Sequence, residues 1–171
     1  WEVSYCQPKN HDFTEFYERV DDIKPDVVGY NVYTGAHIQL KGMLSELKRR
    51  HPEIRTVIGG PHATYFPQEL IDCADNVVMS EGFNAFRRIL NGEFGPGIIE
   101  FLDENMERFS MPDRQGYYRD SPEHKKSRIK SIIGMSGCPY NCTYCNNSDT
   151  GAVVVVPENL RPLSDERFVS L

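Results

Sequence analysis

Strand-like and helix-like patterns of apolar residues alternate along roughly the first ninety positions of the chain. The segment "DVVGYNVY" at 26–33 is apolar and rich in β-branched residues, as a buried strand is. Residues 37–50 then place apolar side chains, Ile38 among them, at the spacing of an amphipathic helix. The other strand-like runs lie at 1–6, 54–60 and 76–82, and the other helical patterns lie at 13–23, 67–73 and 84–92. Strands that alternate with helices predict βαβ units, so we expect an α/β fold with a parallel sheet.

This alternation ends near Phe94. Residues 93–128 are largely polar, with Pro112 and Pro122, and are predicted to form an interdomain linker with one short helix. A further strand is expected at 127–136, and it leads directly into a group of cysteines. The predicted organisation is an α/β domain at 1–92, the linker at 93–128 and the start of a second domain at 129–171.

Composition narrows the class of protein. Hydrophobic residues make up 39% and charged residues 26% of the 171 residues, as in a folded globular chain. No apolar run approaches the ~20 residues that span a bilayer, and a net charge of −6 argues against a general nucleic-acid binder. The five cysteines are an odd number with three clustered, which argues against a secreted disulfide framework. A reducing cytoplasm is the expected location.

The clustered cysteines are Cys138, Cys142 and Cys145, in the spacing C-x3-C-x2-C. Thiolates at this density are ligands for zinc or an iron–sulfur cluster. A four-iron cluster held by three thiolates has one iron without a protein ligand, where a substrate or cofactor can bind.

Zinc remains an alternative for this loop. A structural zinc site needs four ligands, and the remaining candidates for a fourth are Cys6, Cys73 and His124. None of them lies at a zinc-like spacing from the cluster. Cys6 and Cys73 are better explained as buried, inert thiols.

The sequence "CPYNCTYC" resembles the cluster motif of radical S-adenosylmethionine enzymes, C-x3-C-x-aromatic-C. The resemblance implies that Cys138, Cys142 and Cys145 ligate a 4Fe-4S cluster and that Tyr144 lies near the adenine of S-adenosylmethionine. It also implies chelation of the open iron by the amino and carboxylate groups of S-adenosylmethionine, whose cleavage gives a 5′-deoxyadenosyl radical. An external electron donor such as a flavodoxin or ferredoxin is then an expected partner.

The predicted sheet also offers a candidate ligand site. Ligands of open parallel sheets bind beyond the carboxyl ends of the strands, and the loops there are "NVYTGAH", "GGPHATYFP" and "SEGFN". Their glycines allow backbone to approach a ligand closely, although tight strand-to-helix turns use glycine pairs without any ligand. The chain has neither a G-x-G-x-x-G nor a Walker sequence, so dinucleotide and ATP binding are not expected.

Residues 1–92 resemble the cobalamin-binding domain that precedes the radical barrel in one large subgroup of these enzymes. The segments "KPDVVGYNVYTG", "VIGGPHAT" and "VVMSEGFNAFRRIL" carry the resemblance, together with "MPDRQGYY" in the linker. It implies a Rossmann-like, flavodoxin-like parallel sheet, followed after the linker by the start of a (β/α) barrel. The cobalamin contacts that it implies are Tyr33, Thr34, Gly35, Gly59, Gly60, Glu81 and Gly82.

Two departures from the subgroup's pattern concern its contacts. Its usual G-E-G-E is replaced by Ser80-Glu81-Gly82-Phe83, which removes a polar group at Phe83. The D-x-H-x-x-G motif that supplies an axial histidine elsewhere does not occur. We weigh His62 as a cobalt ligand and prefer a loop histidine bonded to backbone or solvent.

The start of the chain resembles the second strand of such a domain. We therefore expect about 25–40 further residues before Trp1, which is room for one more βα unit.

The resemblance implies a cobalamin-dependent radical enzyme that transfers a methyl group to an unactivated carbon of a small-molecule substrate. A radical cyclisation or ring rearrangement with the same cofactors is the first alternative. A non-catalytic α/β binding module with a structural metal loop is the second. No catalytic residue is assigned beyond the cofactor ligands.

Overall fold

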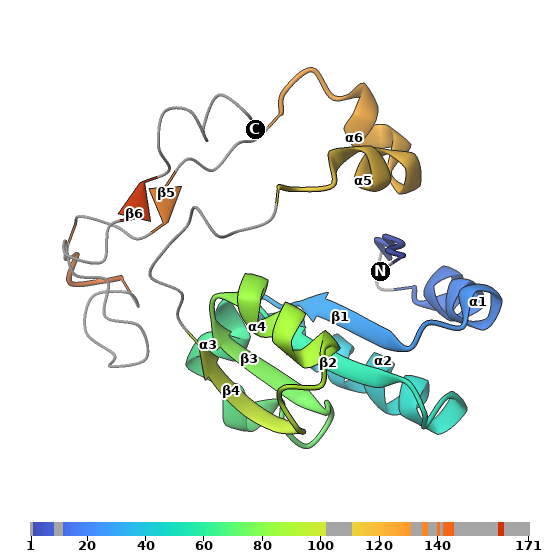
Figure 1. Cartoon of the computed structure of the whole chain (residues 1–171), viewed down its shortest axis with the longest axis horizontal. Helices are drawn as coiled ribbons and strands as arrows, with labels where there is room; N and C mark the ends of the chain where they lie inside the picture. The colour runs from blue at the N-terminus through green and yellow to red at the C-terminus, as the bar shows by residue number, and fades with distance from the viewer. Residues whose placement is uncertain are drawn as a thin grey trace.

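The computed structural model describes residues 2–8, 12–101, 111–130, 135–136, 140, 142–145 and 161–162. Its centre is a parallel sheet whose strands follow one another in chain order, β1-β2-β3-β4 (Figure 1). The strands are β1 (Val27–Asn31), β2 (Arg55–Gly59), β3 (Asn76–Ser80) and β4 (Gly97–Phe101). The predicted parallel α/β fold is confirmed.

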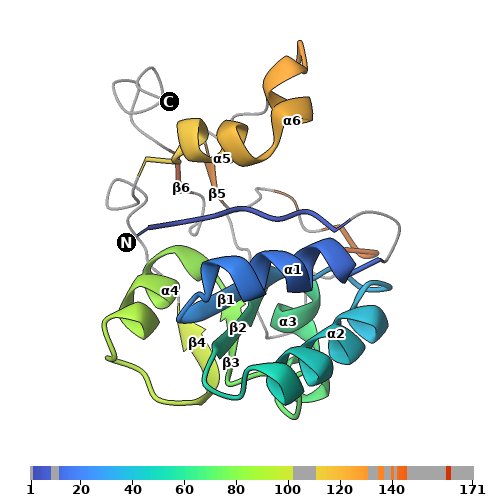
Figure 2. The ribbon, with the colours of Figure 1, turned by 90° about the vertical axis from the view of Figure 1, so that its right-hand side faces the viewer.

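Helices cover both faces of this sheet (Figure 2). They are α1 (Thr14–Ile23), α2 (His37–Arg50), α3 (Pro61–Tyr65), the 3-10 turn η1 (Pro67–Glu69) and α4 (Gly82–Leu90). Two short helices, α5 (Arg114–Asp120) and α6 (Pro122–Lys126), and a small antiparallel pair, β5 (Met135–Ser136) with β6 (Arg161–Pro162), follow the sheet. No helix in the described part of the chain is long and apolar enough to cross a membrane.

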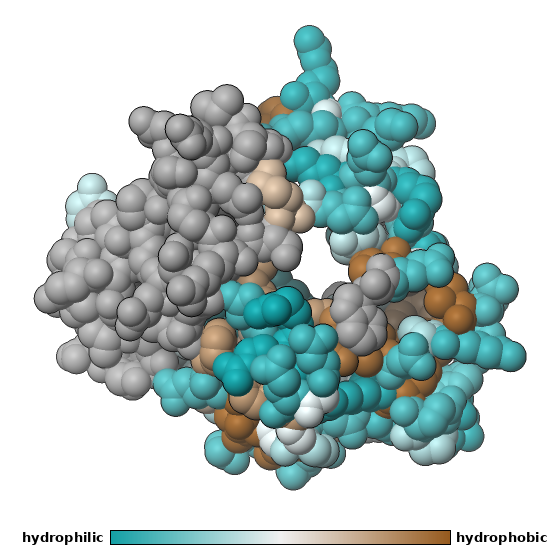
Figure 3. All heavy atoms as spheres, in the orientation of Figure 1, coloured by the Kyte–Doolittle hydropathy of each residue, from teal (hydrophilic) through white to brown (hydrophobic). Residues whose placement is uncertain are grey.

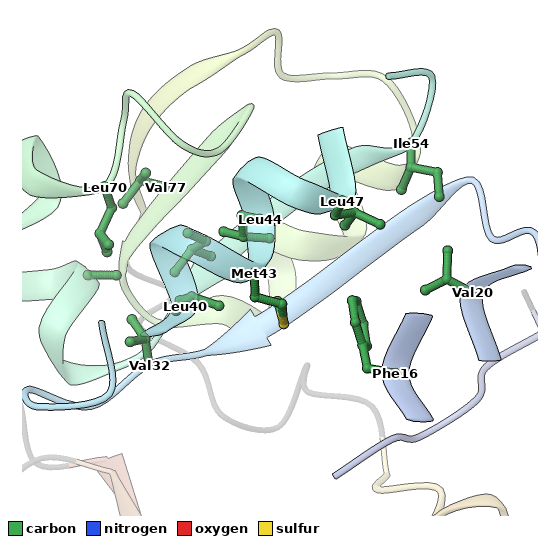
Figure 4. Packing of buried hydrophobic residues seen from close by; sticks show 12 residues of the cluster. Phe16, Val20, Val32, Leu40, Met43, Leu44, Leu47, Ile54, Leu70 and Val77 are labelled. Atoms are coloured by element: carbon green, nitrogen blue, oxygen red, sulfur yellow. The ribbon is translucent and has the colours of Figure 1, made fainter. Parts of the chain in front are cut away.

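The hydrophobic core has two parts, one on each face of the sheet. On one face, α1 and α2 pack their apolar sides against β1, β2 and β3; Figure 4 shows this cluster, with Leu40, Leu44 and Leu47 of α2 at its centre. On the other face, Ala85 and Ile89 of α4 pack against the sheet. Burial on both faces explains why consecutive apolar residues occupy the middle of β2 (Val57 and Ile58) and of β3 (Val77 and Val78).

Polar contacts close the amino edge of the sheet. Arg55 donates to the side chain of Asn76 and to the carbonyls of Ile89 and Phe94. Asp75 accepts hydrogen bonds from the backbone and hydroxyl of Thr56. The polar groups at the amino edge are therefore bonded to one another. We look for a ligand site at the opposite, carboxyl edge of the sheet.

Several predicted elements differ from the structure. Residues 2–6 are not a strand, and the Tyr5 N–H donates to Asp120 of α5 instead of to a neighbouring strand. The helix expected at 67–73 is a single 3-10 turn, and α3 just before it was not predicted. Strand β4, which lies within the predicted linker, was also not predicted. Ile38 is 69% exposed, although it was counted among the apolar positions of its helix.

A polar clasp, defined by Ser4, Tyr5, Arg19 and Asp120, fastens α5 to the rest of the molecule. The Asp120 carboxylate accepts the Tyr5 N–H at 2.9 Å and pairs with Arg19 of α1 at 3.1 Å. Arg19 also donates to Ser4, and the rings of Tyr5 and Tyr117 meet edge to face. On the face seen in Figure 3, α5 and α6 present a mainly hydrophilic surface, so polar contacts are important for holding them.

Candidate functional site

The loops that follow β1 and β2 interlock at the carboxyl edge of the sheet. Asn31 and Gly59 are opposite each other in the register of these two strands. The Val32 N–H then donates to the Gly59 carbonyl at 2.8 Å, and the His62 N–H donates to the Val32 carbonyl at 3.1 Å. The two loops therefore hold each other in place through backbone hydrogen bonds.

Gly60 lies where these loops cross. Its φ is +101°, in the region that glycine alone adopts readily. A Cβ here would lie 1.9 Å from Asn31 Oδ1 and 2.8 Å from the Val32 nitrogen. The protein's own backbone therefore requires glycine at this position, and the close approach of a corrin, which the sequence suggested as the reason, is not needed to explain it.

The other predicted glycines have more open surroundings. Gly35 has a φ of +100°, and nothing lies within 4 Å of an added Cβ. A Cβ at Gly82 would also meet nothing within 4 Å, and at Gly59 it would meet only a carbonyl at 3.9 Å. Space for a ligand is thus available at these three glycines and not at Gly60.

Thr64 links the loop after β3 to the other two. Its hydroxyl donates to the Gly60 carbonyl at 3.1 Å and accepts the Ser80 N–H at 3.0 Å. Ser80 has a positive φ of 61°, which is uncommon for a residue with a side chain. Glu81 follows in an extended conformation as the N-cap residue of α4. The structure therefore brings all three predicted loops to one edge.

His62 is the most buried polar group of this edge, with 2% of its surface exposed. Its Nδ1 lies 3.0 Å from the Thr34 hydroxyl, and its ring stacks on the ring of His37 at 4.0 Å between centroids. Its Nε2 has no hydrogen-bond partner among the described residues, and Glu69 Oε2 lies 3.7 Å away. We expected the His62 side chain to be bonded to backbone or solvent. In the structure it is buried and contacts the side chains of Thr34 and His37 instead.

The charge state of His62 follows from this packing. Burial lowers the pKa of His62 below its usual range, and His37 and Lys41 lower this pKa further, whereas Glu69 opposes them. The imidazole is thus neutral near pH 7. Because its ring is covered by His37 and Phe66, it is poorly placed to reach a cobalt ion outside the loops.

Exposed apolar side chains surround this buried centre, and we call Tyr33, Ile38, Phe66 and Phe83 the apolar rim. Their exposed fractions are 60%, 69%, 43% and 61%, respectively. Tyr33 follows β1 and Phe83 begins α4 after β3, so loops of different strands contribute. Sequence reasoning assigned Ile38 to the buried side of its helix, because a buried and an exposed residue in a first turn can have the same apolar identity. It did not single out Phe66, which lies between α3 and η1.

The cysteine loop is described in part. Cys142 and Cys145 form a tight turn, in which the Cys145 N–H donates to the Cys142 carbonyl at 2.9 Å, and neither is in a disulfide. Tyr144 is 89% exposed. Cys138 lies outside the described residues. Burial raises the pKa of Tyr65 in α3, and Cys145 raises this pKa further.

The other candidate metal ligands are engaged elsewhere. Cys6 and Cys73 pack against the first core cluster, and burial raises the pKa of both thiols, as expected for inert cysteines. His124 lies 2.7 Å from the Tyr117 hydroxyl through its Nδ1 and stacks on that ring. None of the three is joined to the cysteine turn by a contact in the described part.

The fold and this edge match a known family. Residues 1–90 match the B12-binding domain, which is more than half of the chain, so the chain belongs to the B12-binding domain family. The cobalamin-binding fold expected for the first domain is thereby confirmed. The residue-level cobalamin contacts remain predictions.

Two curated proteins are similar over a longer stretch. The anaerobic magnesium-protoporphyrin IX monomethyl ester cyclase of Rubrivivax gelatinosus is 28% identical over 159 residues, which cover 75% of this chain and 28% of that protein. The hopanoid C-3 methylase of Methylococcus capsulatus is 24% identical over 176 residues, which cover 91% of this chain and 33% of that protein. The chain spans about a third or less of the length of these relatives.

Among solved structures, the N-terminal domain of a hypothetical protein from Thermotoga maritima is similar, with a TM-score of 0.45 and 20% identity. The similarity covers 58% of this chain and 78% of that one.

The open glycines and the apolar rim fit a corrin. A large, flat macrocycle needs backbone that can come close to it and apolar side chains that it can cover. Gly35 and Gly82 supply the first, and the apolar rim supplies the second. The edge thus offers room for backbone approach and apolar cover, both of which suit a corrin.

Proposed function

We propose that this chain is part of a cobalamin-dependent radical S-adenosylmethionine enzyme that transfers a methyl group to an unactivated carbon. The observation that carries the proposal is the combination of a B12-binding domain with a C-x3-C-x2-C motif in the same chain. A cobalamin domain alone is compatible with many reactions. The cysteine motif favours those that also use an iron–sulfur cluster and S-adenosylmethionine.

In this proposal the carboxyl edge of the sheet binds cobalamin. The apolar rim covers part of the corrin and excludes water, while Gly35, Gly59 and Gly82 allow the backbone to approach. The interlocked backbone of Val32, Gly59 and His62 fixes the shape of the edge before the cofactor arrives. When bound, cobalamin supplies the capacity to carry a methyl group.

Cys138, Cys142 and Cys145 hold the 4Fe-4S cluster in this proposal. The turn carries Cys142 and Cys145, neither of which is in a disulfide, on the same short loop, as cluster ligation requires. Tyr144, which is exposed in the same turn, contacts the adenine of S-adenosylmethionine in this proposal. When bound, the cluster and S-adenosylmethionine supply radical chemistry.

The names of the relatives leave two reactions to distinguish. Methyl transfer is supported by the methylase, which matches over 91% of this chain. Ring closure is supported by the cyclase, which has the higher identity, 28%. A small-molecule substrate and a flavodoxin or ferredoxin as electron donor complete the proposal in either case.

The cofactor part of the proposal is tested by anaerobic reconstitution of the full-length protein with iron, sulfide and hydroxocobalamin. We expect about four irons and one cobalamin per chain. Replacement of Cys142 by alanine removes the broad thiolate-to-iron absorption and leaves cobalamin bound. Cys73→Ala is the matched control, because this thiol packs in the core and retains the full iron content.

Zinc at one per chain after anaerobic purification, or full iron content in Cys142→Ala, overturns the cluster assignment. A wild-type protein that retains no cobalamin overturns the methyl-transfer reaction.

A further inference from the structure

We propose that His37, His62 and Glu69 form a binding site for a divalent transition-metal ion such as Zn²⁺, independent of the cobalamin and of the cysteine turn. Among the described residues, these three bring their ligand atoms within 4.8 Å of one another. Two imidazoles and one carboxylate are a ligand set that zinc uses, with a fourth position left for water or another ligand.

The buried nitrogen of His62 is the first argument. Its Nε2 is inaccessible and has no hydrogen-bond partner in the described part of the chain, and a buried polar atom without a partner is rare and costly. The atom lies toward Glu69, whose carboxylate is half-exposed and can approach from the solvent side. A cation between the two satisfies the nitrogen and neutralises the carboxylate.

The distances are the second argument. Glu69 Oε2 is 3.7 Å from His62 Nε2 and 3.9 Å from His37 Nε2, which is too long for hydrogen bonds. Ligand atoms about 2.0–2.2 Å from a tetrahedral zinc lie roughly 3.3–3.5 Å apart. The two gaps at the carboxylate therefore need only a small contraction to close around an ion, and the ligand atoms of the two histidines, which lie within 4.8 Å of each other, need a larger one.

Thr34 contacts the other ring nitrogen of His62, Nδ1. Its hydroxyl lies 3.0 Å from Nδ1 and can accept the proton of that nitrogen. This arrangement leaves the lone pair on Nε2, which is the tautomer that a ligand to the metal needs. The loop after β1 thus orients a ligand that is carried by α3.

His37 must adjust to join the site. The Gly35 N–H donates to its Nδ1 at 3.1 Å, which puts the proton of the neutral ring on Nε2. Its ring also stacks on that of His62 at 19°, so the two ring planes are nearly parallel and do not converge on one ion. Ligation by His37 therefore moves its proton to Nδ1, breaks the Gly35 bond and tilts the ring, so His37 contributes less affinity than His62 or Glu69.

Zinc titration of the full-length, cobalamin-free protein tests the proposal, with Cys138, Cys142 and Cys145 replaced by serine so that no thiolate of the cluster loop competes. A chromophoric chelator reports free Zn²⁺. We expect one Zn²⁺ per chain with a Kd of about 1 µM or tighter. With Co²⁺ in its place, visible d–d bands appear without thiolate charge-transfer absorption.

The variants separate this site from surface binding. We expect Glu69→Gln and His62→Gln to weaken Zn²⁺ binding by at least tenfold, and Thr34→Val to weaken it roughly tenfold through the orientation of His62. His51→Gln is the matched control, because His51 lies beside two carboxylates, Asp21 and Glu53, on the surface. Its loss leaves the affinity unchanged.

Two outcomes overturn the proposal: no stoichiometric Zn²⁺ binding, or binding that Glu69→Gln leaves unchanged. Glu69→Gln keeps the test valid if His62→Gln fails to fold, since Glu69 is half-exposed. Cobalamin plays no part in this assay, so its result is independent of the proposed enzyme function.

Discussion

Two loops at the carboxyl edge of the sheet contain glycines with the same backbone conformation and opposite surroundings. Gly60, after β2, has a φ of +101° and Gly35, after β1, has a φ of +100°. An added Cβ would collide with Asn31 and Val32 at Gly60 and would meet nothing within 4 Å at Gly35. The comparison separates a glycine that the fold requires from one that leaves room for a ligand, although both belong to segments that resemble the same family.

The largest effect on the free energy of unfolding is expected from Gly60→Val. Strain at a positive φ costs about 1–3 kcal/mol and overpacking a further ~1–3 kcal/mol, so we expect a loss of roughly 3 kcal/mol or more in the free energy of unfolding. Urea unfolding followed by circular dichroism measures this loss. Gly59→Ala is the matched control, because its Cβ meets only a carbonyl at 3.9 Å. An unchanged urea midpoint for Gly60→Val contradicts the interlocked-loop geometry.

Gly35→Ala is expected to cost less. The added methyl group meets no atom, so only the backbone strain remains, roughly 1–2 kcal/mol. If the loop after β1 approaches cobalamin, equilibrium dialysis with hydroxocobalamin shows weaker binding in the same variant. If Gly35→Ala lowers the free energy of unfolding as much as Gly60→Val does, the predicted difference between the surroundings of the two glycines is wrong.

A pH dependence of stability is the next effect in size. The pKa of His62 is lowered in the folded protein, so below pH 6.5 the unfolded chain takes up a proton that the folded chain does not. The contribution of His62 to stability is complete above this pH and is lost as the pH falls through the lowered pKa. Unfolding between pH 7.5 and 5 shows a smaller decline in His62→Gln than in wild type; equal declines exclude His62 as the source.

The smallest effect on stability is expected from Tyr33→Ser. Tyr33 is 60% exposed, and its loss changes the free energy of unfolding by about 0.5 kcal/mol or less. Hydroxocobalamin binding weakens if the apolar rim covers the corrin. Tyr30→Ser is the comparison variant, because Tyr30 packs against the core and its loss lowers stability instead. Unchanged binding in Tyr33→Ser argues against the rim as a corrin contact.

The sheet could be predicted from sequence because short apolar runs alternate with helical patterns, and its inner strands β2 and β3 are buried along most of their length. Strands β1, β2 and β3 and helix α2 follow the expected segments closely, since local apolar patterns coincide with burial. Residues 2–6 have the same strand-like pattern, but a strand also needs a partner, and the Tyr5 N–H is bonded to Asp120 instead. Helix α3 has five residues, too few for a helical period to be recognised.

The site was less predictable than the sheet, because it depends on contacts between loops that are far apart in the sequence. The loops themselves could be placed at one edge, because the carboxyl ends of parallel strands meet there. The collision at Gly60, the burial of His62 and its position beside Glu69 depend on how the loops after β1 and β2 cross. Such crossings join residues nearly thirty positions apart and leave no periodic trace in the sequence.

The polar clasp also limits the distance from the sheet domain at which the cysteine loop can lie. Asp120 joins α5 to α1 and to the segment at 2–8, so the chain leaves the sheet domain from a fixed point near Lys126. Cys138 lies twelve positions after Lys126, and a fully extended chain of that length reaches at most about 40 Å. The anchored helix thus sets the radius within which Cys138, the first of the proposed cluster ligands, must lie, and a longer connection would widen this radius.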